Sequence, residues 1–321
     1  MSKHMVLGID TSNYTTSCAM LDTNSMMLVQ KKQLLPVAEG AKGIRQSDAV
    51  FHHVRQLPAL LDALFAEAGD APCAVGVSVK PTAAEGSYMP CFLAGECAAA
   101  AAAGAAGIPL ETTTHQTGHI LAALLSCGKL DLIRRTGGFY AFHVSGGTTD
   151  AVLCEPDAET VLRITPLAKS LDLKAGQAVD RVGLTLGLRF PCGAALEQLA
   201  AQSDTVFKIK PVLRGGDCSL SGLENRCARM LADGVPNADV AKYCLDFLTE
   251  TISAMTAFLI GTHGAKPVVF AGGVMSDRLI QNKLAERFSA QFAEPALSCD
   301  NAAGVAVYAA LKRGLLKWLQ R

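Results

Sequence analysis

The pattern that most constrains the fold of this chain is a set of three short strands that occurs twice. Apolar, β-branched runs are separated by polar turns, and after each set the periodicity becomes helical. The strands are predicted at 6–10, 15–21, 26–34, 138–144, 151–154 and 160–164. A duplicated unit of strands followed by helices predicts a two-lobed α/β fold with its ligand in the cleft between the lobes.

The remaining periodicity completes each lobe. A helix is expected from Ser47, as its N-cap, through Leu64, and an alanine-rich helix at 92–108. The other expected elements are strands at 74–79, 110–113 and 267–270 and helices from His115, at 173–186, at 194–201, from Ser221, at 239–261 and at 301–319. We place the domain boundary after residue 135, which gives an N-terminal domain 1–135 and a C-terminal domain 136–321.

Composition limits the class of protein. With 321 residues, 50% hydrophobic and 18% charged, the chain can bury a large core, and its 29 basic residues balance 29 acidic ones. No net charge draws it to nucleic acid or to an anionic membrane. The eleven cysteines include no Cys-x-x-Cys pair, which favours a reducing cytosol. The chain shows no signal-peptide pattern, and its longest apolar stretch, 92–108, is interrupted by Glu96, so we expect a cytoplasmic protein without a membrane span.

The pair His115 and His119 predicts a metal site. Residues four apart lie on one face of a helix, where both imidazoles can reach one ion. His143 and Asp300 are the candidates for further ligands, and three imidazoles with one carboxylate suit zinc or ferrous iron. The alternative is one capping and one buried histidine.

A second histidine pair is interpreted differently. His52 and His53 are adjacent on the helix that follows the first strands, so they cannot share a face. We expect them at the surface or between the lobes.

Three turns at strand ends are candidates for binding an anion. Asp10 precedes Thr11 and Ser12, which together offer a carboxylate and donors for a phosphate or a metal-bound water. Ser145, Gly146 and Gly147 occupy the equivalent place in the second lobe, where paired glycines let backbone amides approach an anion. The third turn is Gly272-Gly273, with Ser276 as a cap for the helix that follows. Ligand-free hairpin turns are the alternative for the first two.

Taken in order, these segments resemble the TsaD family, also called Gcp or YgjD, of the actin, sugar kinase and Hsp70 superfold, once described as O-sialoglycoprotein endopeptidases. The resemblance runs over nearly the whole chain, with Asp10 where that family usually has glutamate. The matching segments are 7–12, the pair His115 and His119, 144–147, 170–181, 190–197, 219–223 and 299–303.

The resemblance implies a function. Members of the family bind threonylcarbamoyl-adenylate, or ATP in a similar pose, and transfer the threonylcarbamoyl group to an adenosine of tRNA. A metal would polarise the carbamoyl carbonyl and the glycine turns would hold the phosphate. The resemblance further implies a ribose-binding Asp180, an adjoining Gly193 and Glu197 in the nucleoside site, a metal-binding Asp300, and Asp10 as an orienting carboxylate.

The resemblance also implies partners. The family works with a smaller homologous TsaB-like subunit and a TsaE-like ATPase, and tRNA would be bound through these partners because the chain itself has no net charge.

Departures from the family pattern keep alternatives open. Asp277 stands where the family has asparagine, which would put a negative charge where an amide contacts the nucleotide, and 85–90 replaces a Gly-Pro-Gly-Leu segment. A paralogue that binds ATP without transfer, or acts on another acceptor, is therefore a second hypothesis. A metallopeptidase is the third and weakest, because Gln116 and Thr117 follow His115 where His-Glu-x-x-His proteases have their glutamate.

Overall fold

The computed structural model describes residues 4–12, 14–36, 44–294, 297 and 301–320. The chain forms two compact units, one made of 1–131, 157–162 and 299–321 and the other of 132–156 and 163–298. The expected boundary after residue 135 is close to residue 131, after which the chain first passes into the second unit. The expected C-terminal domain 136–321 differs at its end, because 299–321 belongs to the first unit.

The first unit is built on a five-stranded mixed sheet of order β3-β2-β1-β4-β5. Its central strand β1 is apolar and buried along its whole length, antiparallel to β2 and parallel to β4, while β2 pairs antiparallel with β3 and β4 pairs parallel with β5. The elements are β1 Met5–Asp10, β2 Thr15–Asp22, β3 Leu28–Leu34, α1 Gln46–Ala68, β4 Ala74–Lys80, α2 Phe92–Ala106, β5 Leu110–Thr114, α3 His115–Ser126, η1 Leu130–Arg134, α10 Ala302–Lys312 and η3 Lys317–Gln320.

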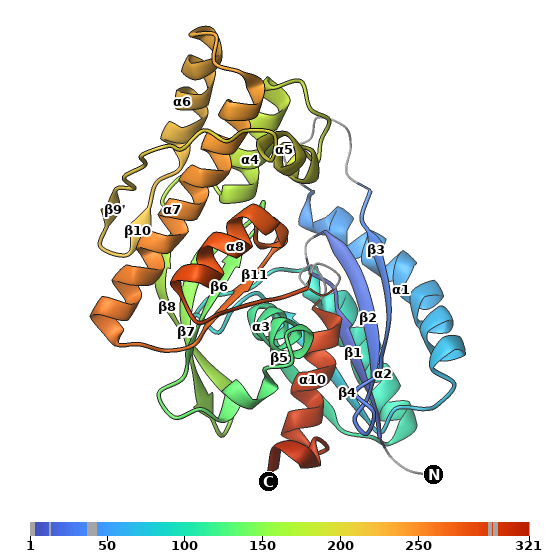
Figure 1. Cartoon of the computed structure of the whole chain (residues 1–321). Helices are drawn as coiled ribbons and strands as arrows, with labels where there is room; N and C mark the ends of the chain where they lie inside the picture. The colour runs from blue at the N-terminus through green and yellow to red at the C-terminus, as the bar shows by residue number, and fades with distance from the viewer. Residues whose placement is uncertain (1–3, 13, 37–43, 295–296, 298–300, 321) are drawn as a thin grey trace. The chain divides into compact units, whose positions relative to one another are not determined.

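Small residues explain why α10 belongs to the first unit. Figure 1 shows α10 beside β1, β4 and α3. A Cβ placed on Gly304 would lie 1.8 Å from the carbonyl oxygen of Gly118 in α3, and one on Gly8 would lie 2.1 Å from that of Ala302. Backbones can approach this closely only where side chains are absent. The helix ends at Lys312 instead of running on to residue 319, and η3 follows.

The second unit repeats the plan of the first, with a sheet of order β12-β11-β6-β7-β8. Strand β6 is antiparallel to β7 and parallel to β11, which is parallel to β12. The elements are β6 Phe139–Val144, β7 Thr149–Asp157, β8 Val161–Lys169, α4 Ala175–Thr185, α5 Gly193–Ala200, β9 Leu213–Arg214, β10 Asp217–Cys218, α6 Ser221–Ala232, α7 Asn237–His263, β11 Val268–Ala271, η2 Gly273–Ser276, α8 Arg278–Arg287 and β12 Ala290–Phe292. The expected duplication and two-lobed α/β class are therefore confirmed.

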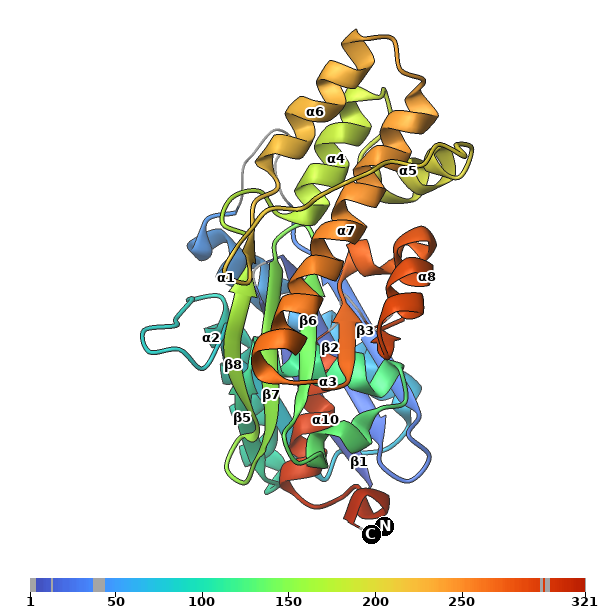
Figure 2. The same cartoon turned by 60° about the vertical axis from the view of Figure 1, so that its left-hand side comes forward.

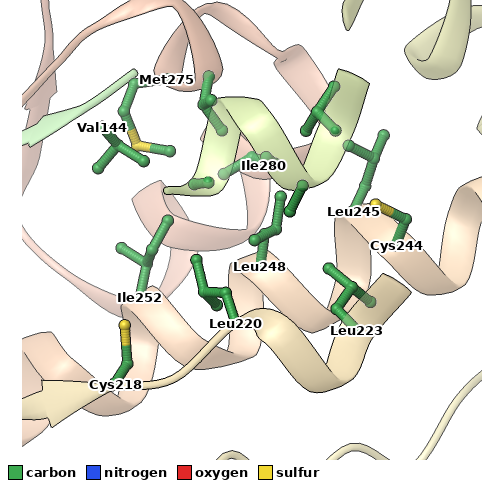
Figure 3. Packing of buried hydrophobic residues seen from close by; sticks show 14 of the residues in the cluster. Val144, Cys218, Leu220, Leu223, Cys244, Leu245, Leu248, Ile252, Met275 and Ile280 are labelled. Carbon is green, nitrogen blue, oxygen red and sulfur yellow. The ribbon is translucent and has the colours of Figure 1, made fainter. Parts of the chain in front are cut away.

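The core of the second unit lies between its sheet and its helices. Figure 2 shows α4, α6 and α7 side by side, and Figure 3 shows Leu248, Ile252, Met275 and Ile280 meeting within this core. Helix α7 is, among the described residues, long and apolar enough to cross a membrane, but 56% of its most apolar window is buried inside the unit. That burial is typical of a core helix in a folded domain.

Two expected helix starts are wrong. Helix α1 begins at Gln46, with Arg45 in the N-cap position in place of Ser47, and continues through Pro58. Helix α8 is capped by Asp277, whose side chain accepts a hydrogen bond from the Ile280 amide at 3.0 Å, and not by Ser276. The reason is that residues 273–276 form η2, which displaces the helix start by one residue.

Candidate active site

Asp10 lies at the centre of a polar cluster in the first unit, which we define as Asp10, Ser78, His115, His119 and Asn301. The two histidines are half-buried and the other three residues are buried. Its carboxylate accepts a hydrogen bond from the Ser78 hydroxyl and lies 3.1 Å, through Oδ1, from Nδ1 of His115. Burial raises the pKa of Asp10, but the charge and hydrogen bond of His115, with hydrogen bonds from Ser78 and Ser12, lower it to about 2. The carboxylate is therefore ionised at neutral pH.

The two histidines of the cluster occupy the first two turns of α3. This helix begins at His115 because the Thr114 hydroxyl caps it, accepting from the Thr117 amide at 3.1 Å. The ring centroids of His115 and His119 are 4.5 Å apart, edge to face. Asn301, just before α10, places Nδ2 2.8 Å from Nδ1 of His115, and its buried Oδ1 has no hydrogen-bond partner among the described residues.

The side chains of this cluster fit part of a metal site. Two imidazoles on adjacent helical turns, an ionised carboxylate behind one of them and a buried amide oxygen without a partner are groups that a divalent cation would satisfy. Within the described ranges, no group of three or more His, Cys, Asp or Glu side chains is arranged to hold a metal ion. A complete set therefore needs the further ligands that the sequence predicts.

The other predicted ligands and the second histidine pair are placed as follows. His143 lies near the end of β6, half-buried in the second unit, and Asp300 lies outside the described residues, so both stay predictions. The surface interpretation of His53 is wrong: this residue is fully buried, and its Nδ1 lies 2.8 Å from the Thr16 hydroxyl. Burial lowers the pKa of His53 to about 4.

A pocket of about 420 Å³ lies in the second unit and collects most of the nucleotide-site candidates. Gly146, Asp180, Gly193, Glu197, Gly273 and Asp277 line it, together with Gly176, Val179, Pro191, Ala194, Leu245, Val274, Ser276 and Ile280. We call it the second-unit pocket. Its volume suits a small-molecule ligand.

The turn after β6 borders this pocket. The Ser145 hydroxyl oxygen accepts hydrogen bonds from the amides of Gly147, at 3.3 Å, and Thr148, at 3.1 Å, which fixes the turn and leaves the hydroxyl proton to donate. Gly146 faces open space, and a Cβ on Gly176, in the first turn of α4, would lie 2.6 Å from the Gly146 amide nitrogen. The absence of a side chain at Gly176 thus brings a helix N-terminus, which favours anions, against the turn.

Three carboxylates in the pocket are each fixed by the backbone. Asp180 accepts from the Cys192 amide and Glu197 from the Arg278 amide, both at 2.9 Å. Asp277 caps α8 and is 9% exposed. Burial raises the pKa of Asp277 to about 6; the charge of Glu197 acts in the same direction, against the amides of Ile280 and Leu279 and the charge of Lys283.

This shift predicts a pH-dependent stability. Because the pKa of Asp277 is higher in the folded than in the unfolded chain, its contribution is complete below the unfolded value of 3.8 and is lost as pH rises through about 6. A pKa that rises from 3.8 to about 6 corresponds to roughly 3 kcal/mol. Since asparagine caps helices equally well, we expect Asp277→Asn to raise the free energy of unfolding by up to about 3 kcal/mol at about pH 8 and by much less at about pH 4. Urea unfolding at both pH values measures this, and equal curves at about pH 8 would contradict it.

Some residues of these sites escaped the sequence analysis. Ser78 is the last buried residue of β4, and its role follows from the parallel pairing of β4 with β1, in which Ile9 lies opposite Val77. A polar residue directly after an apolar run is the signal that pointed to Asp10, and it applies equally to Ser78, which follows the run 74–77. Nothing in the local sequence marks Gly176 as the neighbour of Gly146.

Comparisons with known proteins agree with this architecture. The model of the family described as TsaD, tRNA N6-adenosine threonylcarbamoyltransferase, matches residues 30–307. Component A of the Acidaminococcus fermentans (R)-2-hydroxyglutaryl-CoA dehydratase is similar in structure, with a TM-score of 0.54 and 14% identity over 99% of this chain and 100% of that one.

Two further structures are similar. One is a ROK family glucokinase from Streptomyces griseus, solved with glucose and AMPPNP, with a TM-score of 0.52 and 14% identity over 97% of this chain and 99% of that one. The other is full-length HypF in its phosphate- and nucleotide-bound form, with a TM-score of 0.60 and 12% identity over 98% of this chain and 47% of that one. At such identities the likeness shows the fold alone, and it confirms the expected superfold of actin, sugar kinases and Hsp70.

Proposed function

This chain belongs to the TsaD family, and from that membership we propose that it is a nucleotide-binding transferase that moves a threonylcarbamoyl group from its adenylate to an adenosine of tRNA. The observation that supports this proposal most is the second-unit pocket. It joins an open glycine turn and a helix N-terminus, which suit a phosphate, to carboxylates and apolar side chains, which suit a nucleoside.

In this proposal the second-unit pocket holds the adenylate. The turn of Ser145, Gly146 and Gly147 binds the phosphate, and the turn of Gly272 and Gly273, which follows the neighbouring strand, borders the same nucleotide. Asp180 accepts from the ribose hydroxyls, and Gly193 leaves room beside it. Because Asp180 already accepts from one backbone amide, its remaining lone pairs are the ones available to the ligand.

We further propose that His115, His119, His143 and Asp300 hold one divalent metal, iron or zinc. When bound, the metal would supply a Lewis acid that polarises the carbamoyl carbonyl. Asp10 then acts as a positioning residue: its ionised carboxylate holds Nδ1 of His115 and so orients the imidazole and fixes its tautomer. This assigns Asp10 a definite contact in place of the general role near phosphate and metal that the sequence indicated.

The proposal includes partners and location. A TsaB-like subunit and a TsaE-like ATPase would assist, and tRNA would be bound through them in the cytoplasm. The equal numbers of basic and acidic residues support this arrangement, because they leave the chain without an excess of charge to bind RNA.

A second candidate function is nucleotide binding without transfer, as a regulatory or structural subunit or with a different acceptor. The observation that favours it is the burial of Asp277 beside Glu197, which adds negative charge to the pocket that would receive an already anionic adenylate. The metallopeptidase alternative is weaker, because the residues between the two histidines, Gln116 to Gly118, carry no carboxylate.

The test is an assay of the purified, metal-loaded protein with threonylcarbamoyl-adenylate and tRNA, with and without the two partner proteins. We expect modified nucleoside and released AMP, both measured by mass spectrometry, beside a TsaD of established activity as a positive control. AMP without modified tRNA would favour a different acceptor, and neither product from a protein that binds ATP would favour the non-catalytic candidate.

A further inference from the structure

An extended segment of the second unit, residues 206–211, has no partner for its backbone. It lies between α5 and β9, where Figures 1 and 2 show it as a long trace outside any helix or strand. Within the described part of the chain, no hydrogen bond between main-chain groups involves these residues. Backbone amides and carbonyls nearly always pair with protein, water or a ligand. The amides of 206–210 are therefore available to donate to a ligand.

The side chains of this segment alternate between the protein and the solvent. Phe207 and Ile209 are half-buried, and the ring of Phe207 packs edge-on against that of Tyr243 in α7, with centroids 5.2 Å apart. Lys208 and Lys210 are exposed. An alternation of this kind has the period of a β-strand, so the inward residues fix the segment on the unit and both lysines lie on its outward face.

The outward face belongs to a patch of positive charge. Residues 205–216 contain three basic residues, Lys208, Lys210 and Arg214, and no acidic one. Arg226 in α6 adds a fourth, because its side chain lies beside the hydroxyl of Tyr243. We call Lys208, Lys210, Arg214 and Arg226 the basic strip. All four are exposed, and none forms an ion pair with another described residue.

The acids that flank the basic strip are directed to other donors. Asp239 accepts hydrogen bonds from the hydroxyls of Ser203 and Thr205, and Asp217 accepts one from the Lys169 amide at 2.8 Å. A chain with equal numbers of acidic and basic residues therefore carries a local excess of positive charge. Exposed cations beside free backbone amides are the groups that contact the phosphates of a nucleic acid.

We propose that the basic strip binds RNA phosphates, so that this chain has a contact of its own with tRNA in addition to those of the proposed partners. The inference rests on the proposed function for the identity of the RNA. The lysines and arginines would neutralise phosphates, and the amides of 206–210 would donate to phosphate oxygens.

An acidic protein segment that adds a strand to the extended backbone is the alternative occupant. Two observations favour RNA. Pro211 has no amide proton, so it interrupts one edge of the segment. Arg226 lies on a helix, so the four cations do not follow a single strand edge but spread over a surface.

The experiment measures binding of labelled tRNA to the full chain, without partners, by filter binding at several salt concentrations. Each cation that neutralises a phosphate of a single strand contributes about 0.7 to the slope of log affinity against log salt concentration. Replacing two of them, in the double variant Lys208→Ala with Lys210→Ala, should lower the slope by about 1.4. If the two proteins bind equally at about 1 M salt, the variant binds about 25-fold more weakly than the wild type at about 0.1 M.

The matched control removes two charges from other exposed positions, as Arg135→Ala with Lys317→Ala, and should keep the wild-type slope. Lysines that only protect an extended edge from aggregation would leave the slope of the Lys208 and Lys210 variant unchanged. Such an unchanged slope, or no binding of tRNA by the wild type alone, would overturn the inference and leave the proposed function intact, with tRNA held by the partners.

Two further outcomes separate the remaining possibilities. Polyglutamate that binds the wild type through Lys208 and Lys210 and is not displaced by tRNA would assign the strip to an acidic protein and overturn the inference. Binding of tRNA that depends on the strip, together with no modified nucleoside from the complete system, would support the RNA contact and overturn the proposed function.

Discussion

His119→Ala is expected to abolish stoichiometric metal binding, and His115→Ala to do the same. The two imidazoles sit on adjacent turns of α3 with their rings 4.5 Å apart, and a metal that loses one of so few ligands is held far more weakly. Removal of a residue that only hydrogen-bonds to a metal ligand typically lowers metal affinity by roughly 10–100-fold. We expect removal of a ligand itself to lower it further. Metal content by mass spectrometry of the purified protein, with competition by a chelator, measures it.

The control must be a histidine outside the cluster. His263→Ala is suitable, because His263 is exposed in the last turn of α7, and metal content should stay at the wild-type level. His53 is not suitable, since it is fully buried against Thr16 and its loss would leave a cavity. Asp10→Asn keeps the shape of the cluster but removes the charge beside His115. Its metal content should therefore lie between that of His119→Ala and that of the control. Equal metal content in His119→Ala and His263→Ala would remove the metal proposal.

The sequence predicts most of the fold, because alternation and helical periodicity identify the elements that bury an apolar face. The duplicated strands appear where expected, and both sheets follow the same plan. Periodicity identifies a buried face but not its partner, which is why the return of α10 to the first unit was not predicted. That partner is selected by Gly8, Gly118 and Gly304, whose significance depends on residues far away in the sequence.

The same distinction between local signals and distant partners applies to the residues of the candidate site. Turn residues such as Gly146 and Gly273 carry local signals and line the second-unit pocket as a group. Other residues act through a neighbour that the local sequence does not identify: Ser78 matters because β4 lies beside β1, and Asn301 because α10 lies beside α3. Asp277 shows a third case. The local sequence pointed to Ser276 as the cap and the family resemblance placed Asp277 at the nucleotide, whereas in the structure Asp277 both caps α8 and lines the pocket.

The contact between α10 and α3 carries the largest expected effect on stability. In Gly304→Ala the new Cβ would lie 1.8 Å from the carbonyl oxygen of Gly118 and 2.7 Å from the amide nitrogen of Ala122. Both are backbone atoms, so a side-chain rotation cannot relieve the clash and the helices must separate. Overpacking of a core usually costs about 1–3 kcal/mol, and we expect at least the upper end here. Thermal and urea unfolding measure the loss.

A glycine-to-alanine substitution in α2 is not expected to reduce stability. Gly104→Ala lies in α2, where a Cβ meets nothing within 4 Å, so it should leave stability unchanged or raise it by up to about 1 kcal/mol through the higher helix propensity of alanine. Gly304→Ala should also lower metal content, because α3 carries His115 and His119 while Asn301 directly precedes α10. Equal stability of the two variants would show that α10 does not pack on α3 through Gly304. In that case the contact between the two helices would not be what aligns the metal ligands.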